Sequence, residues 1–212
     1  MNYLAHIYLA SHSDEAMLGA LLGDFVKPHS GEQFSAEIEA DIVTHRKVDS
    51  FTDSHPLVLN AKSLFAGPRR RYAGILLDVF YDHLLALHWA RYSDVPLDTF
   101  IARFYAALTR RADILPANLA RAAPYMIEQD WLGSYLHYEG VEIAIRRIST
   151  RLSKNGDLLR DGLADLKANY GPIETGCHAF FPDLIAFVAQ RRRAQCVPAS
   201  NRPARPELTI LL

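Results

Sequence analysis

The sequence predicts an all-α protein, a compact bundle of about eight helices. Apolar residues recur at helical spacing along almost the whole chain, whereas runs that alternate apolar and polar positions with β-branched residues are absent. Half of the 212 residues are hydrophobic and 22% are charged, which is ordinary for a globular protein. A chain of this length can bury a sizeable core within one domain. We therefore expect a single helical domain over residues 1–193 and a Pro-rich tail over residues 194–212.

Capping residues, glycines and prolines divide the chain into helices. In the first half of the chain, a Ser-Asp capping signal begins the first predicted helix, and a Pro and a Gly end it. A Ser-His-Pro turn ends the second predicted helix, and a Gly-Pro pair follows the third. These signals predict helices over 13–26, 36–51, 57–65 and 70–91, of which the last is the most apolar. In the second half, turn residues such as Pro116, Gly133, Asn155 and Gly171-Pro172 separate helices predicted over 97–112, 117–129, 135–152, 156–170 and 175–193.

Charge and cysteine content restrict the partners and the compartment. The formal net charge is −1, although acidic residues predominate in the first 60 residues and basic residues in the rest. A net charge this small gives no long-range electrostatic field that would attract nucleic acid or a membrane, so we do not expect either as a partner. Any partner must be recognised by a local patch of the surface. Cys177 and Cys196 stand in no disulfide or zinc-ligand spacing. The start has no basic segment and no apolar run is long enough to span a membrane, so we expect a cytoplasmic protein.

The chemistry is expected in the first 90 residues, which hold most of the nine histidines together with carboxylates in apolar surroundings. Asp78 and Asp82 are one helical turn apart on a largely apolar face. Burial of such a like-charged pair costs on the order of several kcal/mol per ion unless a cation or hydrogen-bond donors compensate. A bound metal ion would resolve this conflict. Alternatively, both carboxylates reach solvent or nearby arginines.

Two further features repeat this theme. His45 and Asp49 are also one turn apart, which suits a metal ligand and the carboxylate that orients it; a histidine on an apolar face can equally bond a backbone carbonyl in the core. Asp24 is expected in the last turn of its helix, where the macrodipole disfavours a carboxylate by about 0.3–1 kcal/mol. A shared cation or a basic neighbour such as Lys27 would compensate it. Oxygen and imidazole ligands without thiolates suit Mn²⁺, Fe²⁺, Mg²⁺ or Zn²⁺.

Several spaced blocks carry a family resemblance. They are MNYLAHIYLA, LLGDFVK, THRKVDSFTDSHP, RRRYAGILLDVFYDHLLALHW and the later step Asp130-Trp131-Leu132. In this order they resemble the acyl carrier protein phosphodiesterase family, and the similarity runs from Met1 to about Arg193. The resemblance implies a helical enzyme related to HD-type phosphohydrolases that requires Mn²⁺ or another divalent ion such as Mg²⁺ or Fe²⁺. The implied reaction is metal-assisted removal of the 4'-phosphopantetheine arm from holo acyl carrier protein, which leaves the apo protein.

The resemblance also implies roles for particular residues. It implies a set of metal ligands, namely Asp24, His45, Asp78, Asp82 and His83. In the implied reaction, His6 is the preferred group to protonate the leaving serine oxygen, and His55 or a metal-bound water would also serve. Asp49 either orients His45 or pairs with Arg46. The tail after Arg193 has no counterpart in the family pattern.

The implied partner points to a basic docking surface, because acyl carrier proteins are acidic. The run Arg69-Arg70-Arg71 is the candidate, since basic residues before a helix oppose its macrodipole and so call for another reason. Such a run can also be a solvated face. Two other classes stay open: an HD-like phosphohydrolase acting on a nucleotide or another small phosphoester, and a non-catalytic helical protein that binds no metal.

Overall fold

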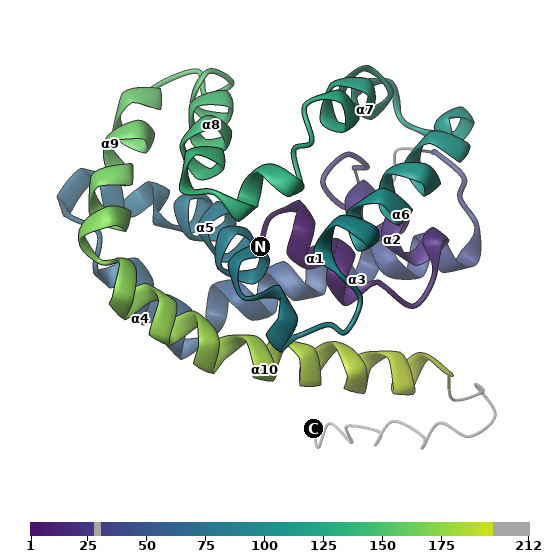
Figure 1. Cartoon of the computed structure of the whole chain (residues 1–212), viewed down its shortest axis with the longest axis horizontal. Coiled ribbons are helices and arrows are strands. Elements are labelled where there is room, and N and C mark those ends of the chain that lie inside the picture. The colour runs from purple at the N-terminus through teal and green to yellow at the C-terminus, as the bar shows by residue number, and fades with distance from the viewer. Residues whose placement is uncertain (28–30, 197–212) are drawn as a thin grey trace, which may run out of the picture.

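The computed structural model describes residues 1–27 and 31–196, and the regular structure within these ranges is entirely helical (Figure 1). This confirms the all-α class. The α-helices are α1 (Tyr3–Leu9), α2 (Asp14–Leu22), α3 (Ala36–Ser54), α4 (Pro56–Ser63), α5 (Ala73–Leu87), α6 (Leu97–Arg110), α7 (Ala117–Glu128), α8 (Tyr138–Ser149), α9 (Gly156–Ala168) and α10 (Tyr170–Cys196). Short 3-10 helices cover Gly67–Tyr72, Trp89–Arg91, Ala112–Ile114 and Gly133–Leu136.

The Pro-rich C-terminal tail and the cytoplasmic location stay predictions. The expected tail falls on residues 197–212, which lie outside the described residues, apart from its first three positions at the end of α10. Within the described ranges, no helix combines the length and the apolar character needed to cross a membrane. The cytoplasmic location remains an expectation from the sequence.

Helix α1 is missing from the predicted set because its cap comes from another helix. The side chain of Asn2 gives no capping hydrogen bond. Instead, the carboxylate of Asp82 in α5 accepts hydrogen bonds from the backbone N–H groups of Leu4 (2.7 Å) and Ala5 (3.1 Å). A carboxylate at this end satisfies unpaired donors and suits the positive end of the helix dipole. A cap that lies 78 positions away leaves no local signal in the sequence.

Two predicted boundaries shift in the first half of the chain. α2 ends at Leu22, before the predicted end at residue 26, and the chain tightens into a turn in which the N–H of Asp24 bonds the carbonyl oxygen of Leu21 at 3.3 Å. This turn carries Asp24 past the end of the helix. The predicted helix over 70–91 begins with the 3-10 helix Gly67–Tyr72, and its α-helical part starts at Ala73.

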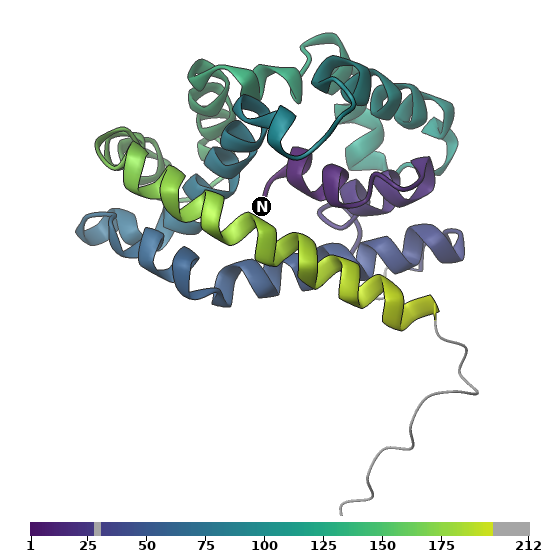
Figure 2. The same ribbon diagram turned by 60° about the horizontal axis from the view of Figure 1, so that its bottom comes forward.

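The predicted turn at Gly171-Pro172 is wrong, because α10 already begins at Tyr170. Pro172 then lies in the first helical turn, where its missing N–H has no intrahelical partner to lose. The long α10 runs across α3 and α4, and the view in Figure 2 shows this crossing from the side of α10. It therefore ties the N-terminal helices to α5 and α9.

The core is organised around α5. Most of its side chains are buried, and α1, α4, α8, α9 and α10 all contact it. Phe80 and Tyr81 are among the largest fully buried side chains. α1 packs on both α2 and α5, and α2 packs along α3. α1, the end of α2 and the middle of α3 are thereby brought together, and this junction positions the side chains described next.

Candidate functional site

Four side chains from three parts of the chain meet at the junction of α1, α2 and α3. Nε2 of His6 lies 3.0 Å from Oδ1 of Asp49, and Nε2 of His45 lies 3.2 Å from Oδ2 of the same carboxylate. Asp24, just after α2, brings its Oδ1 to 3.4 Å from Nε2 of His45. The rings of His6 and His45 stack with their centroids 3.7 Å apart. We call His6, Asp24, His45 and Asp49 the histidine–aspartate cluster.

Helix geometry and one close approach assemble this cluster. His45 and Asp49 are one turn apart on α3 and so lie on the same side of that helix. At the end of α2, a Cβ added to Gly23 would stand 2.2 Å from Cγ of the His45 ring. Gly23 is therefore part of the site, although the sequence prediction missed it. The signal that could have revealed it is a glycine directly before Asp24 at a helix end.

We expect Gly23→Ala to displace the His45 ring and to lower the free energy of unfolding by about 1–3 kcal/mol, the usual cost of overpacking. Urea denaturation measures this loss. Gly176→Ala in α10 is the matched control, because nothing lies within 4 Å of a Cβ added there. The control should be neutral or stabilising, since alanine has the higher helix propensity. Equal stability of the two variants would contradict the close approach.

The backbone holds His45 in one tautomer. Its Nδ1 lies 2.7 Å from the carbonyl oxygen of Ala20, so Nδ1 carries a hydrogen and donates it. Nε2 then faces two carboxylates. Burial lowers the pKa of His45, but the hydrogen bonds and charges of Asp24 and Asp49 outweigh burial and raise it to about 9. The metal-free protein near pH 7 therefore has a cationic His45, and its contacts hold the pKa of Asp49 far below the ordinary value despite burial.

We expect this imidazolium to stabilise the metal-free protein below neutral pH and to lose that effect in alkali. The pKa of His45 is about 9 when folded and 6.5 in the reference state. Its stabilisation is therefore complete below about pH 6.5 and disappears as the pH rises through about 9. It amounts to at most about 3 kcal/mol. Urea unfolding of the wild type and His45→Gln with a chelator should show a difference that shrinks from about pH 6 to about pH 10, and a constant difference would contradict the assignment.

A cation lies beside the cluster, the amino group of Met1. It is 2.8 Å from Oδ1 of Asp78 and 3.6 Å from Oδ1 of Asp49. Burial lowers the pKa of this amino group, but Asp78 and Asp49 outweigh it and raise the pKa to about 10. Asp78 thus reaches the edge of the cluster through the ammonium group. The sequence prediction considered side chains alone and missed this contact.

The structure places Asp82 and His83 outside the cluster. Both oxygens of Asp82 accept N–H groups of α1, and burial raises the pKa of Asp82 to about 7 against these bonds. Nδ1 of His83 lies 2.7 Å from the carbonyl oxygen of Tyr135, and its Nε2 lies 3.1 Å from the hydroxyl of Tyr170. The repulsion between the charges of Asp78 and Asp82 is thus relieved by the terminal amino group and by two backbone N–H groups. The role of Asp78, Asp82 and His83 as metal ligands stays a prediction.

His55 also lies apart from the cluster, at the junction of α3 and α4. Its Nδ1 accepts a hydrogen bond from the N–H of Leu57 at 3.3 Å and so caps α4. Its Nε2 lies 3.4 Å from Oδ2 of Asp183 in α10. Both ring nitrogens therefore contribute to helix packing, and its role as an alternative proton donor stays a prediction.

The three consecutive arginines have different surroundings. Arg69 forms a bidentate pair with Asp165 of α9 through Nε at 2.7 Å and Nη2 at 2.9 Å. Arg70 bonds a backbone carbonyl of α4, and the guanidinium of Arg71 lies 5.5 Å from the centre of the Tyr72 ring. Arg69 therefore joins the 3-10 helix to α9, whereas Arg70 and Arg71 are exposed. Their contact with a partner stays a prediction.

The cluster offers the donors that a divalent ion needs. The donor atoms of His6, His45 and Asp49 lie within 4.8 Å of one another. Two ligands about 2.1 Å from one ion and at right angles are about 3 Å apart, close to the 3.0 and 3.2 Å separations of these atoms. Burial lowers the pKa of His6 to about 4, so His6 is neutral near pH 7. The residues fit a divalent ion, and His45 would have to lose the proton on Nε2 to serve as a ligand.

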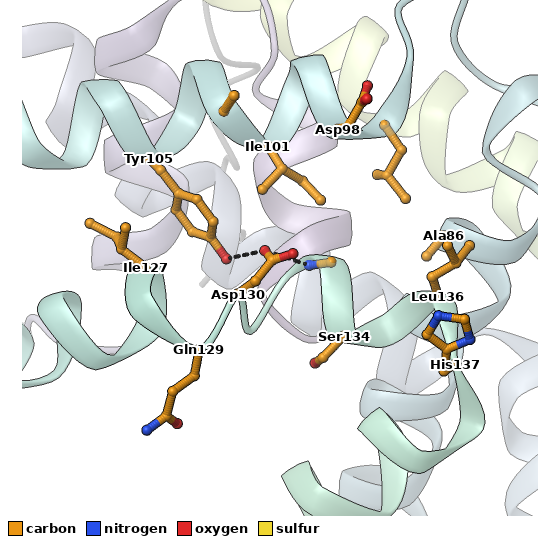
Figure 3. A pocket seen from close by; sticks show the side chains of 13 residues that line it. Ala86, Asp98, Ile101, Tyr105, Ile127, Gln129, Asp130, Ser134, Leu136 and His137 are labelled. Atoms are coloured by element: carbon orange, nitrogen blue, oxygen red, sulfur yellow. Dashed lines mark hydrogen bonds between the residues drawn. The ribbon is translucent and has the colours of Figure 1, made fainter.

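A groove of about 880 Å³ lies between α6, the end of α7 and the 3-10 helix Gly133–Leu136 (Figure 3). Its lining is mainly apolar and includes Ile101 and Ile127. Oδ1 of Asp130 accepts hydrogen bonds from the hydroxyl of Tyr105 and from the N–H of Gly133, both at 3.1 Å. None of the four cluster residues lines this groove, so it is a separate feature of the molecule.

Comparisons with known proteins cover nearly the whole chain. The model of the family described as acyl carrier protein phosphodiesterase matches residues 1–184. Proteins with this name from Salmonella dublin and from Escherichia coli O157:H7 are each 32% identical to the chain over 192 residues, which is 90% of this chain and 99% of the relative. No solved structure gives a significant match. The resemblance read from the sequence blocks is confirmed, and the chain belongs to the acyl carrier protein phosphodiesterase family.

Proposed function

We propose that this chain hydrolyses the phosphodiester that joins 4'-phosphopantetheine to a serine of acyl carrier protein. The oxygen of water bonds to phosphorus, the bond from phosphorus to the serine oxygen breaks, and a proton from water ends on that oxygen. The products are the apo carrier with a free serine hydroxyl and 4'-phosphopantetheine. The family match over residues 1–184 and the names of the relatives support this substrate. The observation that carries the proposal is the histidine–aspartate cluster, in which α1, α3 and the end of α2 bring two buried imidazoles and two carboxylates together.

We infer that the histidine–aspartate cluster holds a divalent ion, Mn²⁺ by the family resemblance or a similar ion such as Mg²⁺ or Fe²⁺. Imidazole and carboxylate donors without thiolates suit such ions. A bound ion supplies Lewis acidity, which activates water and offsets charge on the phosphoryl oxygens. Its ligands would be His6, Asp24, His45 and Asp49, with Asp78 at the edge of the site.

The residues of the chain prepare this centre. The carbonyl oxygen of Ala20 fixes the His45 tautomer at 2.7 Å, as outer partners of ligating histidines commonly do. The lowered pKa of His6 leaves it neutral near pH 7, which suits a ligand better than the donor of a proton to the leaving serine oxygen. Asp82 holds the N-terminus of α1, the helix that carries His6, and does not belong to the proposed ligand set.

Mass spectrometry of the carrier tests this function directly. Holo acyl carrier protein incubated with the protein and Mn²⁺ should lose the mass of the phosphopantetheine arm, and a chelator should abolish the loss. An intact carrier in the presence of a protein that binds stoichiometric metal would contradict the proposal and favour an HD-like phosphohydrolase acting on a small phosphoester. An intact carrier and no bound metal would favour a non-catalytic binding protein.

Charge reversal at the exposed arginines tests where the carrier docks. We expect the double variant Arg70→Glu, Arg71→Glu to raise the KM for holo acyl carrier protein about tenfold, because two attractive contacts become repulsive. Cleavage of a small phosphodiester should not change. Arg121→Glu on α7 is the matched control, because this arginine is exposed on another helix. Equal KM values for the double variant and the control would place the docking surface elsewhere.

A further inference from the structure

Two imidazoles and one carboxylate also meet between the end of α5 and α10, and they share no residue with the histidine–aspartate cluster. Nε2 of His88 lies 2.7 Å from Oε1 of Glu174, and Nε2 of His178 lies 3.9 Å from the same oxygen. The ring centroids of the two histidines are 4.6 Å apart. One donor atom from each residue falls within a span of 4.8 Å.

The surrounding structure fixes these three residues. His88 is the C-cap of α5, and Glu174 and His178 are one turn apart on α10. Nδ1 of His178 lies 3.1 Å from the hydroxyl oxygen of Tyr92. When Nδ1 donates to this oxygen, Nε2 keeps its lone pair on the side of Glu174.

We propose that His88, Glu174 and His178 form a second metal site, which binds Zn²⁺. Two histidines and one glutamate are a donor set that zinc uses with three protein ligands and a water in the fourth position. The side chains are 29%, 19% and 28% exposed for His88, His178 and Glu174, so solvent can reach one side of the ion. Imidazole donors suit zinc better than magnesium or calcium.

An ion at this site would join the end of α5 to α10. α10 also packs against α3 and α4, as Figure 2 shows, so the ion would link the central helix to the helix that crosses the N-terminal half. None of the three residues belongs to the histidine–aspartate cluster. Because the two sites share no residue, occupation of the second site can be followed through stability, separately from the reaction.

Equilibrium dialysis against Zn²⁺ counts the bound ions. Glu174→Gln and His178→Gln should each bind one zinc ion per chain fewer than the wild type. The same substitutions made in Asp49→Asn should each bind one zinc ion per chain fewer than Asp49→Asn alone. His137→Gln, at an exposed histidine, is the matched control and should leave the count unchanged. Zinc should raise the Tm of the wild type and of Asp49→Asn by more than it raises the Tm of Glu174→Gln.

A second measurement uses the unaltered chain, so that it does not depend on the folding of a variant. Stoichiometric zinc should shift the ring ¹H–¹⁵N resonances of His88 and His178 in the NMR spectrum. Unchanged zinc counts in folded Glu174→Gln and His178→Gln would overturn the proposal, and so would unshifted resonances of both histidines at saturating zinc. The 2.7 Å contact between His88 and Glu174 would then be a hydrogen bond alone.

Discussion

Asp49→Asn is expected to lower kcat for release of 4'-phosphopantetheine by more than about 100-fold, while the chain still folds. Asp49 contacts both imidazoles of the cluster, His6 at 3.0 Å and His45 at 3.2 Å. An amide in its place carries no charge and presents N–H groups where lone pairs are needed. Removal of an outer partner of a metal ligand typically costs about 10- to 100-fold, so the loss of a residue in direct contact with the ion should exceed this. Initial rates at saturating Mn²⁺ measure the effect.

Asp53→Asn is the matched control for this substitution. Asp53 lies one turn further along α3, is 68% exposed and pairs with Lys62 at 2.7 Å. Its replacement should change the rate by no more than about twofold, as is usual for surface positions. Circular dichroism of both variants checks the fold. Similar rates for the two variants would show that Asp49 has no part in the reaction.

Asp82→Ala is expected to cause the largest loss of stability among these variants. It leaves the N–H groups of Leu4 and Ala5 buried without their acceptor, at a cost of about 1–3 kcal/mol for each. The free energy of unfolding should therefore fall by about 2–6 kcal/mol. Asp161→Ala on α9 is the control, because Asp161 is exposed within a helix, and its effect should stay within about 0.5 kcal/mol. Urea denaturation followed by circular dichroism gives both values.

The same variant separates a capping role for Asp82 from a ligand role. If Asp82 caps α1, folded Asp82→Ala keeps most of the Mn²⁺ affinity of the wild type and loses stability. If Asp82 is a ligand, the affinity falls steeply and the stability without metal changes little. Stability that equals that of the Asp161→Ala control would therefore contradict the capping role.

Local patterns predicted most of the fold and failed where distant groups decide the structure. Apolar spacing and turn residues predicted the helical class and the order of α2 to α9, because those signals lie within each helix. α1 left no such signal, since Asp82 caps it from α5. The proline at position 172 was taken for a break, but the first turn of a helix tolerates proline.

The candidate site was predictable where one helix brings residues together. The spacing of His45 and Asp49 places both on one face of α3, and the structure adds Asp24 from the end of α2. The stacking of His6 on His45 depends on how α1 packs against α2, which no local pattern encodes. The spacing of Asp78 and Asp82 correctly indicated a conflict of charge. Backbone N–H groups and a terminal amino group relieve it, and neither appears in a pattern of side chains.

The most direct test of the central claim is a titration with Mn²⁺ that is followed by the EPR signal of the free ion. We predict a stoichiometric site in the wild type that is lost in His45→Gln and in Asp49→Asn together with cleavage of holo acyl carrier protein. Folded Asp82→Ala should keep this site. Wild-type affinity for Mn²⁺ in His45→Gln, or full cleavage after removal of all divalent ions, would contradict the claim that the histidine–aspartate cluster binds the ion that the reaction needs.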